Sequence, residues 1–155
     1  MLATTTLLNS VGAELAQDPA VHAMTDVTGF GLLGHGLEMA RGSRAQLVID
    51  AGSIPLLARA AELARNGYVT GASQRNWASY GAEVELPVAL ADWERQLLTD
   101  PQTSGGLLVS VLAARADALV KTIRGAGYPA ASIVGRVEAG APGISVTGSF
   151  ASARR

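Results

Sequence analysis

The sequence contains no cysteine, and this absence excludes several kinds of site. Without a thiol, the chain has no disulfide bond, no thiolate metal site and no cysteine nucleophile. Lysine is nearly missing too, because Lys121 is the only lysine among 12 basic residues and falls in a predicted surface helix over residues 114–125. Phosphate-transfer sites commonly place a lysine on the phosphate. We therefore do not expect such a lysine within this chain.

Long apolar runs and clustered positive charge are also missing. The apolar runs fall far below the ~20 residues of a membrane-spanning helix, and residues 1–10 carry no basic segment typical of a signal peptide. The net charge is −1 and the basic residues are scattered, which argues against a nucleic-acid footprint. We therefore expect a cytoplasmic protein with neither a membrane nor a nucleic-acid partner.

The chain does have enough periodic apolar segments for one domain. A domain of 155 residues buries roughly 70% of its unfolded surface. Hydrophobic spacing and turn residues predict five helices and five strands. The helices cover residues 3–17, 28–41, 54–65, the segment around residues 93–98, and 114–125; the strands cover 21–27, 45–50, 107–111, 132–137 and 143–147.

Residues 67–90 have weak periodicity and are predicted to form a long polar and aromatic loop, of the kind that is often functional. Separated strands with intervening helices indicate an α/β (mixed α+β) fold, a three-layer α/β/α domain around a mixed sheet. We place this domain at residues 1–150, followed by a short disordered tail at 151–155.

Two polar, glycine-bearing segments stand out from the rest of the chain. In the first, residues 25–31 (TDVTGFG) place Asp26 between two hydroxyl residues, just before a turn that opens a helix. A helix N-terminus has free N–H groups and partial positive charge, which suit phosphate. A carboxylate beside it can hold the Mg²⁺ that accompanies a nucleotide. The alternative is that Asp26 merely caps a nearby turn.

The second segment is residues 99–106 (TDPQTSGG), which run into a predicted strand. It is either a functional loop or a proline-bearing turn that ends a helix, and the sequence favours neither. Ser104 does not resemble an activated nucleophile, because no histidine partner is suggested. No set of residues in the chain supplies a nucleophile, a base and an orienting group together.

Gly29, Gly31 and Gly34 also fit the glycine fingerprint of dinucleotide-binding domains, with Asp50 at the end of the next strand as the ribose-binding acid. The strand before such a fingerprint is buried on both faces and should be continuously apolar. Here residues 25–28 are mostly polar. A NAD-binding domain therefore remains the less favoured alternative.

Three conspicuous side chains have simpler structural interpretations. His35 falls within a predicted helix, where a lone histidine is more often a solvated or core residue than a ligand. We interpret Trp77 and Trp93 as packing residues rather than as platforms for a cofactor.

Three segments together resemble the C-terminal half of selenophosphate synthetase (selenide, water dikinase). They are residues 23–32 (AMTDVTGFGL), 75–81 (RNWASYG) and 98–108 (LTDPQTSGGLL). The three occur in the family's order and spacing, and the resemblance covers essentially the whole chain. The wider group is the aminoimidazole ribonucleotide (AIR) synthetase-like superfamily, whose members share an Asp-x-Thr-Gly motif and use ATP.

The resemblance implies a two-domain, homodimeric enzyme that converts ATP, selenide and water to selenophosphate, AMP and phosphate. In that family the N-terminal domain carries the reactive cysteine or selenocysteine, a catalytic lysine and several metal-binding aspartates. We expect the present chain to be the C-terminal domain alone, without the N-terminal catalytic domain and with no catalytic residue of its own. The alternative of another class is a stand-alone module that binds a small molecule or a partner.

Carried over residue by residue, the resemblance makes Asp26 a Mg²⁺ ligand. It also implies a set of ATP-binding positions in the two glycine-bearing segments, which would act together with the N-terminal domain: Thr28, Gly29, Gly31, Asp100, Thr103, Ser104 and Gly105. The cofactors implied are thus Mg²⁺ and ATP, and the second substrate is selenide.

Overall fold

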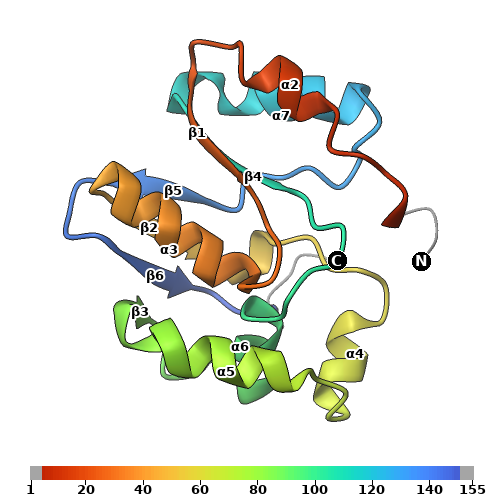
Figure 1. Ribbon diagram of the computed structural model, residues 1–155, viewed down its shortest axis with the longest axis vertical. Helices are drawn as coiled ribbons and strands as arrows, with labels where there is room; N and C mark the ends of the chain where they lie inside the picture. Colours follow the sequence, from red (N-terminus) through yellow and green to blue (C-terminus); the bar gives the residue numbers. More distant parts are fainter. Residues whose placement is uncertain (1–4, 151–155) are drawn as a thin grey trace.

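The computed structural model describes residues 5–150 and shows a mixed α/β domain (Figure 1). Its helices are α2 (Val11–Leu15), α3 (Gly31–Ser43), α4 (Ala60–Arg65), α5 (Gly71–Tyr80), α6 (Asp92–Leu98) and α7 (Ala116–Gly125). Its strands are β1 (Val21–Asp26), β2 (Gln46–Asp50), β3 (Val84–Glu85), β4 (Leu107–Val111), β5 (Gly135–Glu138) and β6 (Gly143–Thr147). The predicted mixed α/β class with a mixed sheet is confirmed.

The strands are divided between two sheets. A four-stranded mixed sheet has the order β3-β6-β2-β5, in which β6 runs parallel to both β2 and β3, while β5 runs antiparallel to β2. Leu47, Val48 and Ile49 in β2 are all buried, which is typical of a strand covered on both faces. Strands β1 and β4 form a separate antiparallel pair, with Asp26 opposite Leu107.

Each sheet has its own apolar core. Helix α3 packs on β2 and β6, and the ideal Cβ position at Gly36 lies only 3.2 Å from Ile144 Cδ1, so a small residue lets helix and sheet approach closely. Helices α2 and α7 cover the β1–β4 pair at one end of the molecule, while α4, α5 and α6 lie at the other end (Figure 1). The fully buried side chains include Leu33, Leu37, Leu98, Ile144, Thr99 and Ser73.

Two predicted helices begin in the wrong place. The helix predicted over residues 54–65 begins only at Ala60, because Ser53 donates its hydroxyl to Asp50 Oδ2 (2.6 Å) instead of capping a helix, and Arg59 is left-handed (φ 69°). The helix predicted from residue 28 begins at Gly31, since the Thr28 hydroxyl contacts a histidine rather than the helix N-terminus.

At the N-terminal end, the helix predicted over residues 3–17 is shorter in the structure. Only Val11–Leu15 forms α2, and residues 3 and 4 lie outside the described part of the chain. The strand predicted over residues 132–137 is shifted to Gly135–Glu138. The predicted tail at 151–155 also lies outside the described residues.

The loop predicted over residues 67–90 is wrong, because it contains α5. Thr70 caps this helix by accepting the backbone N–H of Ser73 (3.2 Å). The buried residues of α5 are Ser73, Asn76 and Tyr80, so the face turned inward is polar. Hydrophobic periodicity is the main sequence signal of a helix, and a helix that buries polar groups does not give that signal.

Candidate functional site

The two glycine-bearing segments meet in the structure. They are residues 27–30, which follow β1, and residues 99–106, which precede β4; we call them the first and second loop. The backbone N–H of Val27 donates to the carbonyl of Gly106 (2.9 Å), and that of Gln102 donates to the carbonyl of Thr28 (3.0 Å). The two loops, about 70 residues apart in sequence, thus lie side by side between the end of β1 and the start of α3.

Glycines allow this close approach. At Gly31, where φ is +70°, the ideal Cβ position lies 2.7 Å from the Thr99 carbonyl carbon. At Gly105, it lies 1.7 Å from the Val27 carbonyl oxygen, so no side chain fits there. Gly29 is different, because nothing lies within 4 Å of its Cβ position and it is exposed.

Asp26 is the last residue of β1 and is exposed. No hydrogen bond or ion pair of its carboxylate is found among residues 5–150, so it does not cap a turn there. A free carboxylate at this position could hold a metal ion. The described residues contain no group of three or more His, Cys, Asp or Glu side chains that could do so together. This part of the chain therefore offers one free carboxylate at the end of β1 and no cluster that could hold a metal ion alone.

The hydroxyl of Thr28 is already engaged. Its Oγ1 lies 3.0 Å from His35 Nε2, and His35 Nδ1 lies 2.9 Å from Glu38 Oε2. Both ring nitrogens have partners and His35 is 8% exposed, so of the two structural interpretations, solvated or core, the structure shows the core one. The contact with His35 holds the Thr28 side chain just before the start of α3.

The second loop combines one tethered carboxylate with two exposed hydroxyl residues. Asp100 Oδ1 accepts a hydrogen bond from the Thr70 hydroxyl (2.9 Å). Thr103 and Ser104 are exposed, and Ser104 has a left-handed backbone (φ 57°). The carbonyl of Gly105 accepts a hydrogen bond from the Asn9 side chain (2.8 Å), which ties the loop to the start of the described chain.

Helix α5 contacts both loops, and the sequence did not predict this. The side-chain nitrogen of Asn76 donates to the carbonyl of Gly29 (2.9 Å) and to the carbonyl of Thr99 (3.0 Å). The Tyr80 hydroxyl donates to the carbonyl of Phe30 (2.6 Å). Burial raises the pKa of Tyr80 from 10.0 to about 12. In the sequence, the segment RNWASYG (residues 75–81) resembles the family but has too little hydrophobic periodicity to predict a helix.

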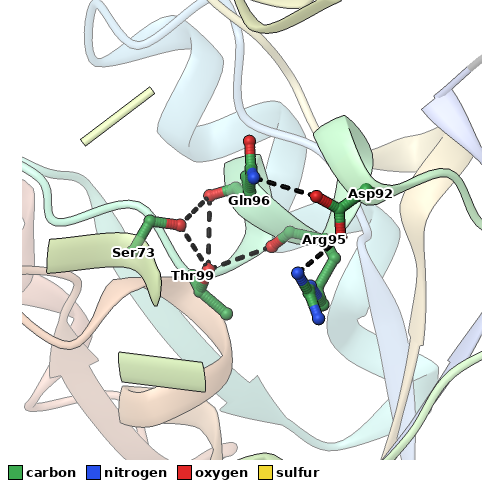
Figure 2. A network of polar contacts seen from close by, with 5 residues as sticks. All are labelled: Ser73, Asp92, Arg95, Gln96 and Thr99. Carbon is green, nitrogen blue, oxygen red and sulfur yellow. Dashed lines mark hydrogen bonds and ion pairs between the residues drawn. The ribbon is translucent and has the colours of Figure 1, made fainter. Parts of the chain in front are cut away.

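A buried polar network joins α5 to the end of α6 (Figure 2). The Ser73 hydroxyl lies 2.6 Å from the Thr99 hydroxyl and 2.7 Å from the Gln96 carbonyl. Ser73 and Thr99 are each 1% exposed. Buried polar groups that find partners fix one arrangement, because leaving them unpaired is costly. Thr99 immediately precedes Asp100, so this network sets where the second loop begins.

The topology excludes the dinucleotide-binding alternative. In that fold the strand before the glycine fingerprint lies in a parallel sheet. Within residues 5–150, β1 pairs only with β4, and the two strands are antiparallel. Asp50, the candidate ribose acid, instead accepts hydrogen bonds from the Gly52 N–H (3.1 Å) and the Ser53 hydroxyl (2.6 Å).

The family model of the AIR synthase related protein, C-terminal domain, matches residues 2–147. The chain belongs to this family. The membership agrees with the mixed α/β fold. No helix within residues 5–150 is both long and apolar enough to cross a membrane.

Similar proteins include several named selenide, water dikinase. The protein of that name from Rhizobium meliloti (strain 1021) is 61% identical over 146 residues, which are 94% of this chain and 42% of that protein. The one from Pseudomonas straminea is 52% identical over 94% of this chain and 41% of its own length. The present chain thus spans about two fifths of these relatives.

A solved structure of hydrogenase maturation protein HypE in complex with ATP has a related fold. The TM-score is 0.53 at 19% sequence identity, covering 85% of this chain and 32% of that one. At this level of identity the likeness concerns the fold.

Proposed function

We propose that this chain is the C-terminal domain of a selenide, water dikinase, and that it supplies one wall of the ATP site. The reaction would convert ATP, selenide and water to selenophosphate, AMP and phosphate. Relatives named selenide, water dikinase that are up to 61% identical support this assignment. The HypE structure, which was solved in complex with ATP, agrees with a nucleotide-binding use of the fold.

The observation that carries the proposal is the joining of the two loops beside a free carboxylate. Backbone hydrogen bonds hold the loops together at the point where β1 ends in the exposed Asp26. Exposed N–H groups and small residues near the start of a helix suit phosphate oxygens. The expected nucleotide contacts come from two groups of residues: Thr28, Gly29 and Gly31 in the first, and Asp100, Thr103, Ser104 and Gly105 in the second.

Within this proposal Asp26 holds Mg²⁺ as one of several oxygen ligands. Mg²⁺ keeps part of its hydration shell and is usually bound by one or two carboxylates together with substrate phosphates. When bound, it neutralises charge on the phosphates that are transferred. The remaining protein ligands would come from outside residues 5–150, in agreement with a chain that spans two fifths of its relatives.

A chimera tests the function directly. The chain replaces the matching 146 residues of the Rhizobium meliloti protein, and purified protein is assayed for AMP and selenophosphate in the presence and absence of selenide. We expect selenide-dependent formation of both products. The control is the same protein with the segment deleted, which we expect to be inactive. A chimera that melts like the parent enzyme but forms neither product contradicts the proposal.

A further inference from the structure

One face of α5, with its capping residue, contacts both loops at once. Thr70, Ser73, Asn76 and Tyr80 follow one another at intervals of three or four residues, which places side chains on the same side of a helix. Thr70 contacts Asp100, and Ser73 contacts the Thr99 hydroxyl. Asn76 contacts the carbonyls of Gly29 and Thr99, and Tyr80 contacts the Phe30 carbonyl. We call these four residues the α5 clasp.

Asn76 holds the central position in the clasp. A single side-chain NH₂ group donates to one carbonyl from each loop, Gly29 and Thr99, and Asn76 is 8% exposed. An amide NH₂ has two donor hydrogens, so both are used. Removing the two donors would leave the carbonyl oxygens of Gly29 and Thr99 without this partner, and the contact with Thr99 is buried. Leaving a buried polar group unpaired costs more free energy than forming its hydrogen bond contributes.

The close packing around the clasp leaves little room for the loops to move independently. The ideal Cβ position of Gly34 lies 3.0 Å from the Tyr80 ring, and that of Gly31 lies 2.7 Å from the Thr99 carbonyl carbon. The first turn of α3 is therefore held against α5 on one side and against the second loop on the other.

We propose that the α5 clasp, and Asn76 above all, is a positioning element that sets the distance between the two loops. The consequence for nucleotide binding rests on the proposed function, whereas the positioning itself rests on the hydrogen bonds alone. Misplacement of binding groups by about 1 Å is enough to impair a site of this kind. Asn76 has no contact with substrate in this scheme and acts only through the backbone of the loops.

The first experiment measures amide hydrogen exchange in the purified 155-residue chain. The informative amides are Val27 and Gln102, whose hydrogen bonds run from one loop to the other. In Asn76→Asp the side chain keeps its size but loses both donors. We expect exchange at these two amides to become at least about tenfold faster, while the amides of β2 change only as far as global stability does.

The matched control is Glu94→Gln. Glu94 is also buried (2% exposed), and it accepts the backbone N–H groups of Ala91 (2.9 Å) and Phe150 (2.7 Å). This substitution therefore disturbs a buried polar contact away from the two loops. We expect it to lower the melting temperature without a specific effect at Val27 and Gln102. Equal acceleration in both variants, or none in Asn76→Asp, overturns the proposal.

Tyr80→Phe provides a second, milder variant should Asn76→Asp not fold. It removes only the hydroxyl that donates to Phe30. We expect smaller acceleration at the same two amides, and unchanged exchange there would equally overturn the proposal.

The chimera then tests the consequence for the nucleotide. We expect the KM for ATP to be about tenfold higher in Asn76→Asp than in Glu94→Gln, although both variants lose a similar amount of melting temperature. If the chimera itself is inactive, the proposed function fails while the exchange result still decides the clasp. If exchange responds but KM does not, the clasp positions the loops and the link to the nucleotide is wrong.

Discussion

At the scale of single residues, Asp26 and the glycines have separate tasks. Asp26 is exposed, and its carboxylate has no hydrogen-bond or ion-pair partner among the described residues. Gly31 and Gly105 are required by the structure, since side chains there would collide with the opposite loop. A glycine of the candidate site can thus be required for folding of the site, whether or not it also contacts a ligand.

The first prediction concerns Asp26→Asn in the chimera. The amide keeps the volume of the carboxylate but loses its charge, so we expect turnover to fall at least about a hundredfold with an unchanged melting temperature. Activity as a function of Mg²⁺ concentration and thermal melting are measured together. Asp117→Asn, at an exposed carboxylate in the first turn of α7, is the control and should remain fully active. A lower melting temperature with retained turnover would show that Asp26 has a capping role.

The second prediction compares two adjacent glycines. Gly105→Ala puts a methyl group where the Val27 carbonyl oxygen lies, 1.7 Å away, whereas nothing lies within 4 Å of the Cβ position of Gly106. We expect Gly105→Ala to lower the free energy of unfolding by about 2 kcal/mol or more, and Gly106→Ala to change it by less than about 0.5 kcal/mol. Urea unfolding of the chain measures both. Similar values for the two variants would contradict the close approach of the loops.

At the scale of secondary-structure elements, α5 shows why polar helices escape detection from sequence. Its inward face contacts backbone carbonyls of the two loops and the end of α6, so it consists of hydroxyl and amide groups. Trp77 and Trp93, interpreted from the sequence as packing residues, are both partly buried against the larger core. The Arg95 guanidinium lies 5.2 Å from the centre of the Trp77 ring and adds a cation–π contact between α5 and α6.

The third prediction uses the titration of Tyr80 to test how α5 is anchored. Burial raises its pKa from 10.0 to about 12 in the folded chain. Between these values the unfolded state has lost the proton while the folded state retains it, so unfolding becomes more favourable as pH rises. We expect the free energy of unfolding attributable to Tyr80 to be constant below pH 10 and to fall by at most about 1.4 kcal/mol per pH unit above it.

Chemical denaturation at several pH values from 8 to 12 measures this slope. The control is Tyr80→Phe, which has no proton to lose at this position and should show a shallower decline above pH 10. The other tyrosines titrate in both proteins, so their contribution cancels in the difference. Identical slopes would mean that the Tyr80 hydroxyl is not held in a buried site.

At the scale of the whole molecule, two sheets with separate cores are connected through the candidate site. The β1–β4 pair lies on the α2 and α7 side, the four-stranded sheet lies on the other, and α3 contacts both (Figure 1). The two loops follow β1 and precede β4, at the point where these parts meet. Under the proposed function this arrangement would supply one wall of the ATP site, and the chain spans about two fifths of its relatives.

The fourth prediction concerns the chain by itself. We expect it to unfold in one cooperative thermal transition, because both cores are formed by its own residues. We also expect no selenide-dependent AMP formation, because the sequence lacks a thiol and residues 5–150 contain no metal-binding cluster. Calorimetry and an AMP assay are the measurements, with the chimera as the positive control. Selenide-dependent AMP formation by the chain alone would contradict the proposal that it supplies only one wall of the ATP site.

The sequence by itself determined the mixed α/β class, most of the strands, the family and the two segments that form the candidate site. These features depend on local hydrophobic periodicity, turn residues and short motifs, all of which are readable along the chain. Only the tertiary structure decided that the two segments are joined, that Ser53 and Thr28 contact side chains instead of capping helices, and that residues 71–80 form a helix. The physical reason is that these features depend on hydrogen bonds between groups distant in sequence, such as Asn76 with Gly29 and Thr99, which leave no periodic pattern.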